Sequence, residues 1–205
     1  MLKKPQVLSV LIIIVLSILF LKGVGSAGLA TRAKESRAER LWKTSGHADT
    51  KGEPFVHWNN DSPREVPTSC AKCHSTPGYL DFLGADGSTP NVVDKNAPVG
   101  TTVECDVCHL DEERGIVRAR PTVTFPSGLI AENLGPEGLC MECHQGRSST
   151  KAVNDRITNA RVTNDDSVNR SLSITNPHYF GAAATQFGTM AKGGYEYTGK
   201  SYDAR

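Results

Sequence analysis

The chain has 205 residues and is almost neutral, with 23 Lys and Arg residues against 22 Asp and Glu residues. This balance lacks the basic surface that nucleic-acid binding requires, so nucleic acid is not expected as a partner. Only 38% of the residues are hydrophobic, whereas 19 are Gly and 11 are Pro. We therefore expect a small apolar core and a mainly α-helical fold with much irregular structure and few short strands.

The N-terminus has the pattern of an export signal. Two lysines precede an apolar run over residues 7–21, and small residues lead up to Ala27, as in a cleaved signal peptide. The run of 15 residues is shorter than the roughly 20 that a membrane-spanning helix needs. We predict a signal peptide over residues 1–27 and a mature domain over residues 28–205, with retention of the segment as a membrane anchor as the alternative.

Export determines where the mature chain works. Loss of the signal removes Lys3, Lys4 and Lys22, which changes the formal charge from +1 to −2. With either fate of the signal, the bulk of the chain crosses the inner membrane. We predict a periplasmic or extracellular protein that contacts the membrane only if the N-terminal segment is retained.

The sequence of the mature chain predicts short helices that are separated by long loops. Start and stop signals, turn residues and periodicity place these elements. The predicted elements are a charged helix over 31–44, loops over 57–70 and 86–98, a strand over 122–125, a helix from Pro136 through the third motif described below, a helix over 149–157, a loop over 158–173, an Ala-rich helix over 176–192 and a hairpin over 195–202.

One pentapeptide occurs three times and uses every cysteine of the chain. Its pattern is Cys-x-x-Cys-His, and successive copies start 35 residues apart. On a helix, positions i, i+3 and i+4 share a face, so each copy can present two thiols and an imidazole together. The residues are Cys70, Cys73 and His74, then Cys105, Cys108 and His109, and finally Cys140, Cys143 and His144.

This spacing is the attachment signature of a c-type haem. Two thiols three positions apart can form thioether bonds to the two vinyl groups of one porphyrin, and the adjoining His then ligates its iron. Zinc sites and disulfides are the alternatives, but neither requires a His directly after each second cysteine. A thioredoxin-like pair would need a βαβ pattern, which is not visible. We predict three covalently attached haem c groups, with His74, His109 and His144 as proximal iron ligands.

Three further histidines match the three irons in number. His47, His57 and His178 are the histidines outside the motifs, and each is a candidate distal ligand. Met190 is the one realistic rival, but a Met on an Ala-rich helix more often packs than ligates. The count predicts bis-His ligation of every iron without assigning a His to a particular haem.

Two strong ligands on each iron predict the function. Such an iron has no vacant position for a substrate, which leaves outer-sphere electron transfer as its chemistry. We therefore expect low-spin haems of low midpoint potential and no enzymatic activity. Aromatic and aliphatic residues over 78–84 are expected to pack on a porphyrin face. Because the haems supply much of the buried apolar surface, we expect the apoprotein to be largely unfolded.

The chain resembles the multihaem c-type cytochromes. Segments 45–49, 67–75, 140–147 and 176–180 are similar to the N-terminal part of larger multihaem cytochromes of respiratory bacteria. The resemblance implies a compact fold organised around covalent haems, and redox partner proteins that include other multihaem cytochromes. In longer members of the family, a segment similar to residues 193–197 precedes further haem motifs. We therefore expect either a short form of the protein or a chain truncated at its C-terminus.

Two alternative functions stay open. A multihaem oxidoreductase would need one iron without a distal His; nitrite reductases of this class often carry Lys in place of His in one motif, and all three motifs here carry His. A membrane-anchored quinol-oxidising cytochrome would need the N-terminal segment to be retained.

Overall fold

The computed structural model describes residues 35–164, 166–178 and 186–203. The predicted signal peptide lies outside these residues. The chain divides into two compact units, residues 1–40 and 41–205, and every site discussed below belongs to the second unit. Among the described residues, no helix combines the length and the apolar character that crossing a membrane requires.

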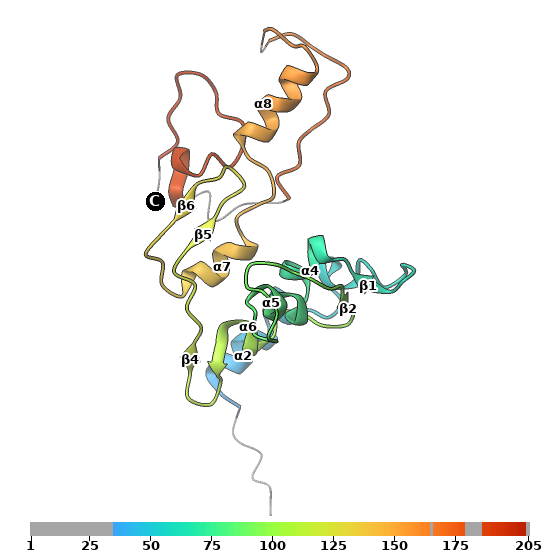
Figure 1. The fold of residues 1–205 in the computed structure, drawn as a ribbon, viewed down its shortest axis with the longest axis vertical. Coiled ribbons are helices and arrows are strands. Elements are labelled where there is room, and N and C mark those ends of the chain that lie inside the picture. The colour runs from blue at the N-terminus through green and yellow to red at the C-terminus, as the bar shows by residue number, and fades with distance from the viewer. Residues whose placement is uncertain (1–34, 165, 179–185, 204–205) are drawn as a thin grey trace, which may run out of the picture. The chain divides into compact units, whose positions relative to one another are not determined.

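Short helices and turns make up most of the described chain (Figure 1). This arrangement confirms the mainly α-helical fold with irregular structure and few short strands. The α-helices are α2 (Arg37–Lys43), α3 (Glu53–Val56), α4 (Thr68–His74), α5 (Thr76–Phe82), α6 (Cys105–Cys108), α7 (Glu137–Cys143) and α8 (Thr150–Asn159), and single turns of 3₁₀ helix are η1 (Gly46–Ala48) and η2 (Gly188–Met190).

The strands form three separate antiparallel pairs of two strands each. Sheets of this size cannot organise a fold alone, and they serve here to fasten loops. The pairs are β1 (Glu65–Val66) with β2 (Ala97–Pro98), β3 (His109–Asp111) with β4 (Ile116–Val117), and β5 (Val123–Thr124) with β6 (Ile130–Ala131).

Three small apolar clusters take the place of one large core. Each helix that carries a motif is held to a cluster by a residue between its two cysteines, namely Ala71 on α4, Val107 on α6 and Met141 on α7. All three side chains are at most 5% exposed. Figure 1 shows the β5 and β6 hairpin beside α7, and Met141 of α7 packs in one cluster with Val123 and Ala131 of this hairpin. The residues inside the motifs therefore anchor the motifs to the protein.

Two glycines allow close packing of the motif helices. A Cβ atom on Gly78 of α5 would lie 2.4 Å from the carbonyl oxygen of Ala71, which lies on α4. A Cβ atom on Gly138 of α7 would lie 2.1 Å from the carbonyl oxygen of Arg120. Between α4 and α5, Ser75 donates to the carbonyl oxygen of Ala71 and accepts from the amide of Gly78. These contacts fix the orientation of α4 and α7.

Several predicted elements are confirmed by the structure. Helix α2 lies within the predicted range 31–44, of which residues 31–34 are outside the described chain. The predicted strand over 122–125 is β5, which the turn after Phe125 joins to β6. The remaining confirmed elements are α7 after Pro136, α8 close to 149–157, and the loop over 158–173 around the undescribed residue 165.

The predicted helix start at Asn176 is wrong. The amide of His178 donates to Oδ1 of Asn176 over 2.7 Å, and His178 has a φ of 61°, which is left-handed and ends rather than starts a helix. The next described residues of this predicted helix, Gln186 and Phe187, are α-helical and lead into the 3₁₀ turn η2, and residues 179–185 lie outside the described chain. The bond to Asn176 is of the kind that an N-cap makes, so the left-handed backbone of His178 is what prevents a helix from starting here.

The predicted hairpin over 195–202 is also wrong, although its turn forms. The amide of Lys200 donates to the carbonyl oxygen of Tyr197 over 3.1 Å. The backbone of Tyr202, however, pairs with Thr189: its carbonyl accepts from the Thr189 amide, and its amide donates to Thr189 Oγ1. These bonds draw the second half of the segment toward η2, so residues 195–202 do not pair with one another as strands.

Candidate functional site

The first motif lies on α4, which brings its three functional groups together. Cys70, Cys73 and His74 share a face of the helix because they are three and four positions apart. Nδ1 of His74 donates a hydrogen bond to the carbonyl oxygen of Pro54 over 2.9 Å. Because a carbonyl can only accept, the lone pair of His74 is on Nε2, where it can bind a metal.

His178 lies opposite His74 although 104 positions separate them. Their Nε2 atoms are 3.5 Å apart, and the ring centroids are 5.8 Å apart with the rings at 79°. The distance between the ring centroids is longer than the distance between the two Nε2 atoms by about twice the radius of an imidazole ring. The two Nε2 atoms therefore point toward each other. The amide of Arg147, which donates to the carbonyl oxygen of Pro177, holds this segment in place.

The third motif has a similar histidine partner. Cys140 and Cys143 lie on α7, and His144 follows as the residue that ends this helix. The rings of His144 and His47 have centroids 6.1 Å apart and are inclined at 44°. The carbonyl oxygen of His47, which lies on η1, accepts a hydrogen bond from the amide of Val103 over 3.1 Å. This bond fixes η1 beside the start of the second motif.

Partial burial favours the neutral form of these imidazoles. Desolvation lowers the pKa of His47, and the neighbouring His144 adds to the effect. Desolvation also lowers the pKa of His178. For His74, desolvation outweighs the hydrogen bond to Pro54, which acts in the opposite direction, so its pKa is lowered too. Neutral imidazole is the form that ligates a metal, so these side chains are suited to that role near neutral pH.

The second motif has no histidine partner among the described residues. Cys105 and Cys108 begin and end the single turn α6, and His109 opens strand β3. Nδ1 of His109 is buried and has no hydrogen-bond partner. The ring contacts between histidines in the described chain join His47 to His144 and His74 to His178, and none involves His109.

His57 lies beside the first motif instead of facing the second. Its Nδ1 is 2.8 Å from Oε1 of Glu53, and its side chain is 60% exposed. Its ring packs edge-on against Trp58 at 4.8 Å, and Trp58 in turn contacts His74 at 5.2 Å. The structure thus places two of the three candidate distal histidines opposite a motif histidine, and His57 is not one of them.

Met190, the rival to the distal histidines, and the aromatic residues over 78–84 also belong to the described chain. Met190 lies on η2 and is 62% exposed. Tyr79 and Phe82, which the sequence suggested would pack on a porphyrin, are buried against Val107 and Leu139. The hydroxyl of Tyr79 donates to the carbonyl oxygen of Leu139 over 3.3 Å, and burial raises its pKa well above the usual range. These aromatic rings therefore hold the motif helices together.

The first and third motifs lie against each other. Sγ of Cys73 is 3.9 Å from the carbonyl oxygen of Glu142, and Sγ of Cys143 is 3.8 Å from that of Lys72. In the thiol form, a hydrogen bond between the two sulfurs lowers the pKa of Cys73 to about 7 and raises that of Cys143. The predicted attachment points of two haems are therefore neighbours.

Three charged residues at this contact were missed from the sequence. Glu142 is 3% exposed, and its carboxylate receives Nζ of Lys72 at 3.0 Å and Nη2 of Arg120 at 2.7 Å. Lys72 and Glu142 are the residues before the second cysteine of their motifs. The sequence feature that could have indicated this contact is the pair of opposite charges at equivalent positions of two motifs. We call Lys72, Arg120 and Glu142 the charge cluster.

A cavity of about 180 Å³ lies at the first histidine pair. Its walls include both cysteines of the first motif, His74 and His178, together with Arg147, whose guanidinium suits a carboxylate such as a porphyrin propionate. Two imidazoles that share one metal at about 2 Å each have their nitrogens about 4 Å apart, close to the 3.5 Å observed. The cavity is smaller than the roughly 300 to 1,000 Å³ of ordinary ligand sites, so a porphyrin requires its walls to separate.

The donor set also fits a porphyrin-bound iron. Within the described residues, no three side chains of His, Cys, Asp or Glu converge to hold a metal ion by themselves. Each of the two histidine pairs offers two nitrogens, which is the number of axial positions that a porphyrin leaves on its iron.

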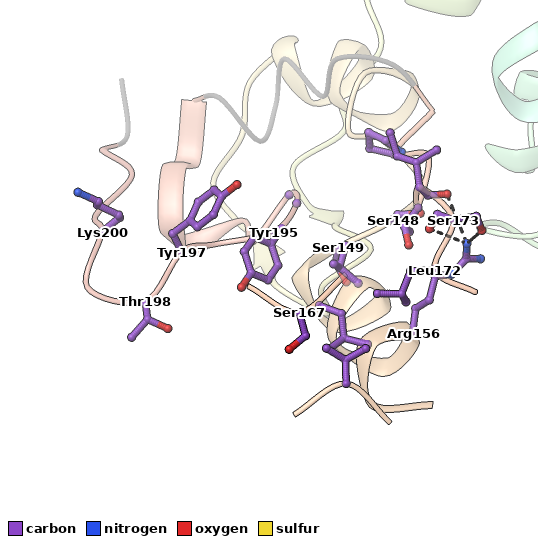
Figure 2. Close-up of a pocket in the computed structure, with 18 of the residues that line it drawn as sticks. Ser148, Ser149, Arg156, Ser167, Leu172, Ser173, Tyr195, Tyr197, Thr198 and Lys200 are labelled. Atoms are coloured by element: carbon purple, nitrogen blue, oxygen red, sulfur yellow. Dashed lines mark hydrogen bonds between the residues drawn. The ribbon is translucent and has the colours of Figure 1, made fainter. Parts of the chain in front are cut away.

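A larger cavity of about 810 Å³ lies near the C-terminal end (Figure 2). Helix α8 forms one wall, and the loop before Pro177 and the segment 193–200 form the others. Arg156 of α8 donates to the carbonyl and hydroxyl oxygens of Ser173 at the edge of this cavity. This cavity adjoins the first histidine pair through the Arg147–Pro177 hydrogen bond, but its polar groups do not converge.

Comparison of the chain with protein-family models, with curated proteins and with solved structures finds no match. The site is therefore interpreted from its own residues.

Proposed function

We propose that the protein is a trihaem c-type cytochrome that transfers electrons in respiratory electron transport outside the cytoplasm. The observation that carries this proposal is the pairing of a motif histidine with a distant histidine at two of the three motifs. His74 and His178 face each other through Nε2, and His144 lies opposite His47. Histidines without a shared ligand are not expected to lie opposite a motif histidine at two separate motifs.

The residues that would hold each haem follow from the motifs. Cys70 and Cys73, Cys105 and Cys108, and Cys140 and Cys143 would form the thioether bonds, and His74, His109 and His144 would be the proximal ligands. When bound, each haem supplies reversible one-electron exchange between ferric and ferrous iron.

The protein's own residues orient the ligands and exclude water. The Pro54 carbonyl fixes the tautomer and ring position of His74, as an outer hydrogen-bond partner does in other metal sites. Trp58, which is 8% exposed, covers the edge of the same ring. Sγ of Cys73 lies against the carbonyl oxygen of Glu142, which brings the first and third motifs together. This adjacency favours electron exchange between haems over chemistry on a bound substrate.

A redox titration tests the proposal. We expect the purified holoprotein to take up three electrons per chain from a chemical reductant and to return them to an oxidant, with the absorption spectrum of low-spin c-type haem. A protein that takes up no electrons would overturn the proposal. We further propose that the partners of this protein are other redox proteins, including multihaem cytochromes.

A second candidate function rests on the second motif. His109 contacts no other histidine in the described chain, and His57 is engaged by Glu53. An iron held by His109 alone would be open to a small ligand, as in a multihaem oxidoreductase. Carbon monoxide added to the reduced protein separates the two functions: one equivalent bound per chain favours an open iron, and none favours a carrier.

A further inference from the structure

The charge cluster lies between two haem attachment motifs and is largely buried. Oε1 of Glu142 accepts from Nη2 and Nε of Arg120 at 2.7 and 2.8 Å, and Oε2 accepts from Nζ of Lys72 at 3.0 Å. Gln145 also donates to the carboxylate over 3.3 Å. The side chains of Lys72 and Arg120 are only 26% and 18% exposed. One negative and two positive charges are thus held in fixed places.

An aromatic ring holds both cations in position. Nζ of Lys72 is 4.7 Å and the guanidinium carbon of Arg120 is 4.9 Å from the centre of the Phe82 ring. Phe82 belongs to the apolar cluster that also contains Leu139 of α7. Cations at this distance from a ring face are attracted to it, so the cluster is tied to the protein as well as to Glu142.

The cluster belongs to the first and third motifs. Lys72 directly precedes Cys73, and Glu142 directly precedes Cys143. The equivalent residue of the second motif is Val107, a buried aliphatic side chain that carries no charge. A change in the cluster should therefore act more strongly on the first and third haems than on the second.

We propose that the charge cluster sets the midpoint potentials of the first and third haems as a pair. This inference rests on the proposed function, because it requires haems on both motifs. A nearby carboxylate stabilises ferric over ferrous iron, and a nearby cation does the reverse; burial leaves both effects poorly screened by solvent. Lys72 and Glu142 also line the cavity at the first histidine pair, so the cluster would act through its charges and not as a ligand of the iron.

Charge-removing variants have opposite expected effects. In Glu142→Gln, two of the three midpoint potentials should rise, with at least a tenfold change in the ferrous-to-ferric ratio at fixed potential, which is 59 mV for one electron. In Lys72→Gln, the same two potentials should fall. The double variant should lie close to the wild type. Glu137→Gln is the matched control, because Glu137 is an exposed carboxylate on the same helix.

Spectroelectrochemical titration of the holoprotein gives the readout. Loss of packing alone would move the potentials of both single variants in the same direction, so shifts of the same sign overturn the inference, as do unchanged potentials. If Glu142→Gln does not fold, the double variant is compared with Lys72→Gln, from which it differs only by loss of the Glu142 carboxylate. The two potentials should be higher in the double variant than in Lys72→Gln. A mass spectrum without covalent haem defeats the proposed function, whereas three haems with unchanged potentials defeat this inference alone.

Discussion

His178 and His74 face each other across 3.5 Å between their Nε2 atoms, although they are 104 positions apart in the sequence. Local structure cannot bring them together. The hydrogen bond between the Arg147 amide and the Pro177 carbonyl, together with the Asn176 side chain, carries His178 to this position. The pairing is therefore a property of the tertiary fold.

Replacement of His178 by Ala should open one iron. We expect one haem in three to become high-spin in the reduced protein and to bind carbon monoxide, because His74 alone would then ligate it. His57→Ala is the control, since its side chain is 60% exposed and faces Glu53, and it should leave the number of low-spin haems unchanged. A loss of low-spin haem in the His57 variant without one in the His178 variant would contradict the assignment.

Replacement of His47 by Ala should open a different iron, the one at the third motif. Because the His47–His144 and His74–His178 pairs share no residue, the effects should add. The double variant His47→Ala with His178→Ala is expected to bind one more equivalent of carbon monoxide than either single variant. Equal binding in the double and single variants would show that both histidines serve the same haem.

Substitution of Gly138 by Ala should destabilise the fold through α7. The new Cβ would lie 2.1 Å from the carbonyl oxygen of Arg120, so helix or loop must shift, which costs about 1 to 3 kcal/mol. Gly46→Ala is the matched control because nothing lies within 4 Å of its Cβ position, and it should change stability by less than about 0.5 kcal/mol. Urea unfolding of the holoprotein measures both; equal stabilities would refute the close packing at Gly138.

The haem-free chain should be largely unfolded. Its three apolar clusters contain only four or five buried residues each, and clusters of this size offset little of the conformational entropy that folding loses. A variant with all six cysteines replaced by Ala should show a far-UV circular dichroism spectrum dominated by disordered chain. A spectrum that matches the holoprotein would contradict this expectation.

The motifs and several of the elements around them could be predicted from local sequence. Pro136 and Glu137 correctly marked the start of α7, and the residues before the turn at Pro126 correctly predicted β5. These features depend on neighbours within a few positions. The same reasoning placed a helix start at Asn176, where the left-handed backbone of His178 prevents it.

The histidine partners and the charge cluster could not be predicted in this way. Only long-range contacts, to His144 and to His74, distinguish His47 and His178 as candidate ligands. His57 instead meets Glu53, which lies four positions earlier in the chain. Lys72 and Glu142 look like solvated charges until α4 and α7 are brought together. Which residues meet across such distances depends on tertiary packing, which a local pattern does not contain.

The intact mass of the purified mature protein tests the central claim most directly. We predict a mass that exceeds that of the polypeptide by three covalently bound haems, and loss of one haem when Cys105 and Cys108 are both replaced by Ala. The mass of the polypeptide part also reveals whether residues 1–27 are removed. A protein exported from a host competent in haem attachment that carries the mass of the bare polypeptide would contradict the account.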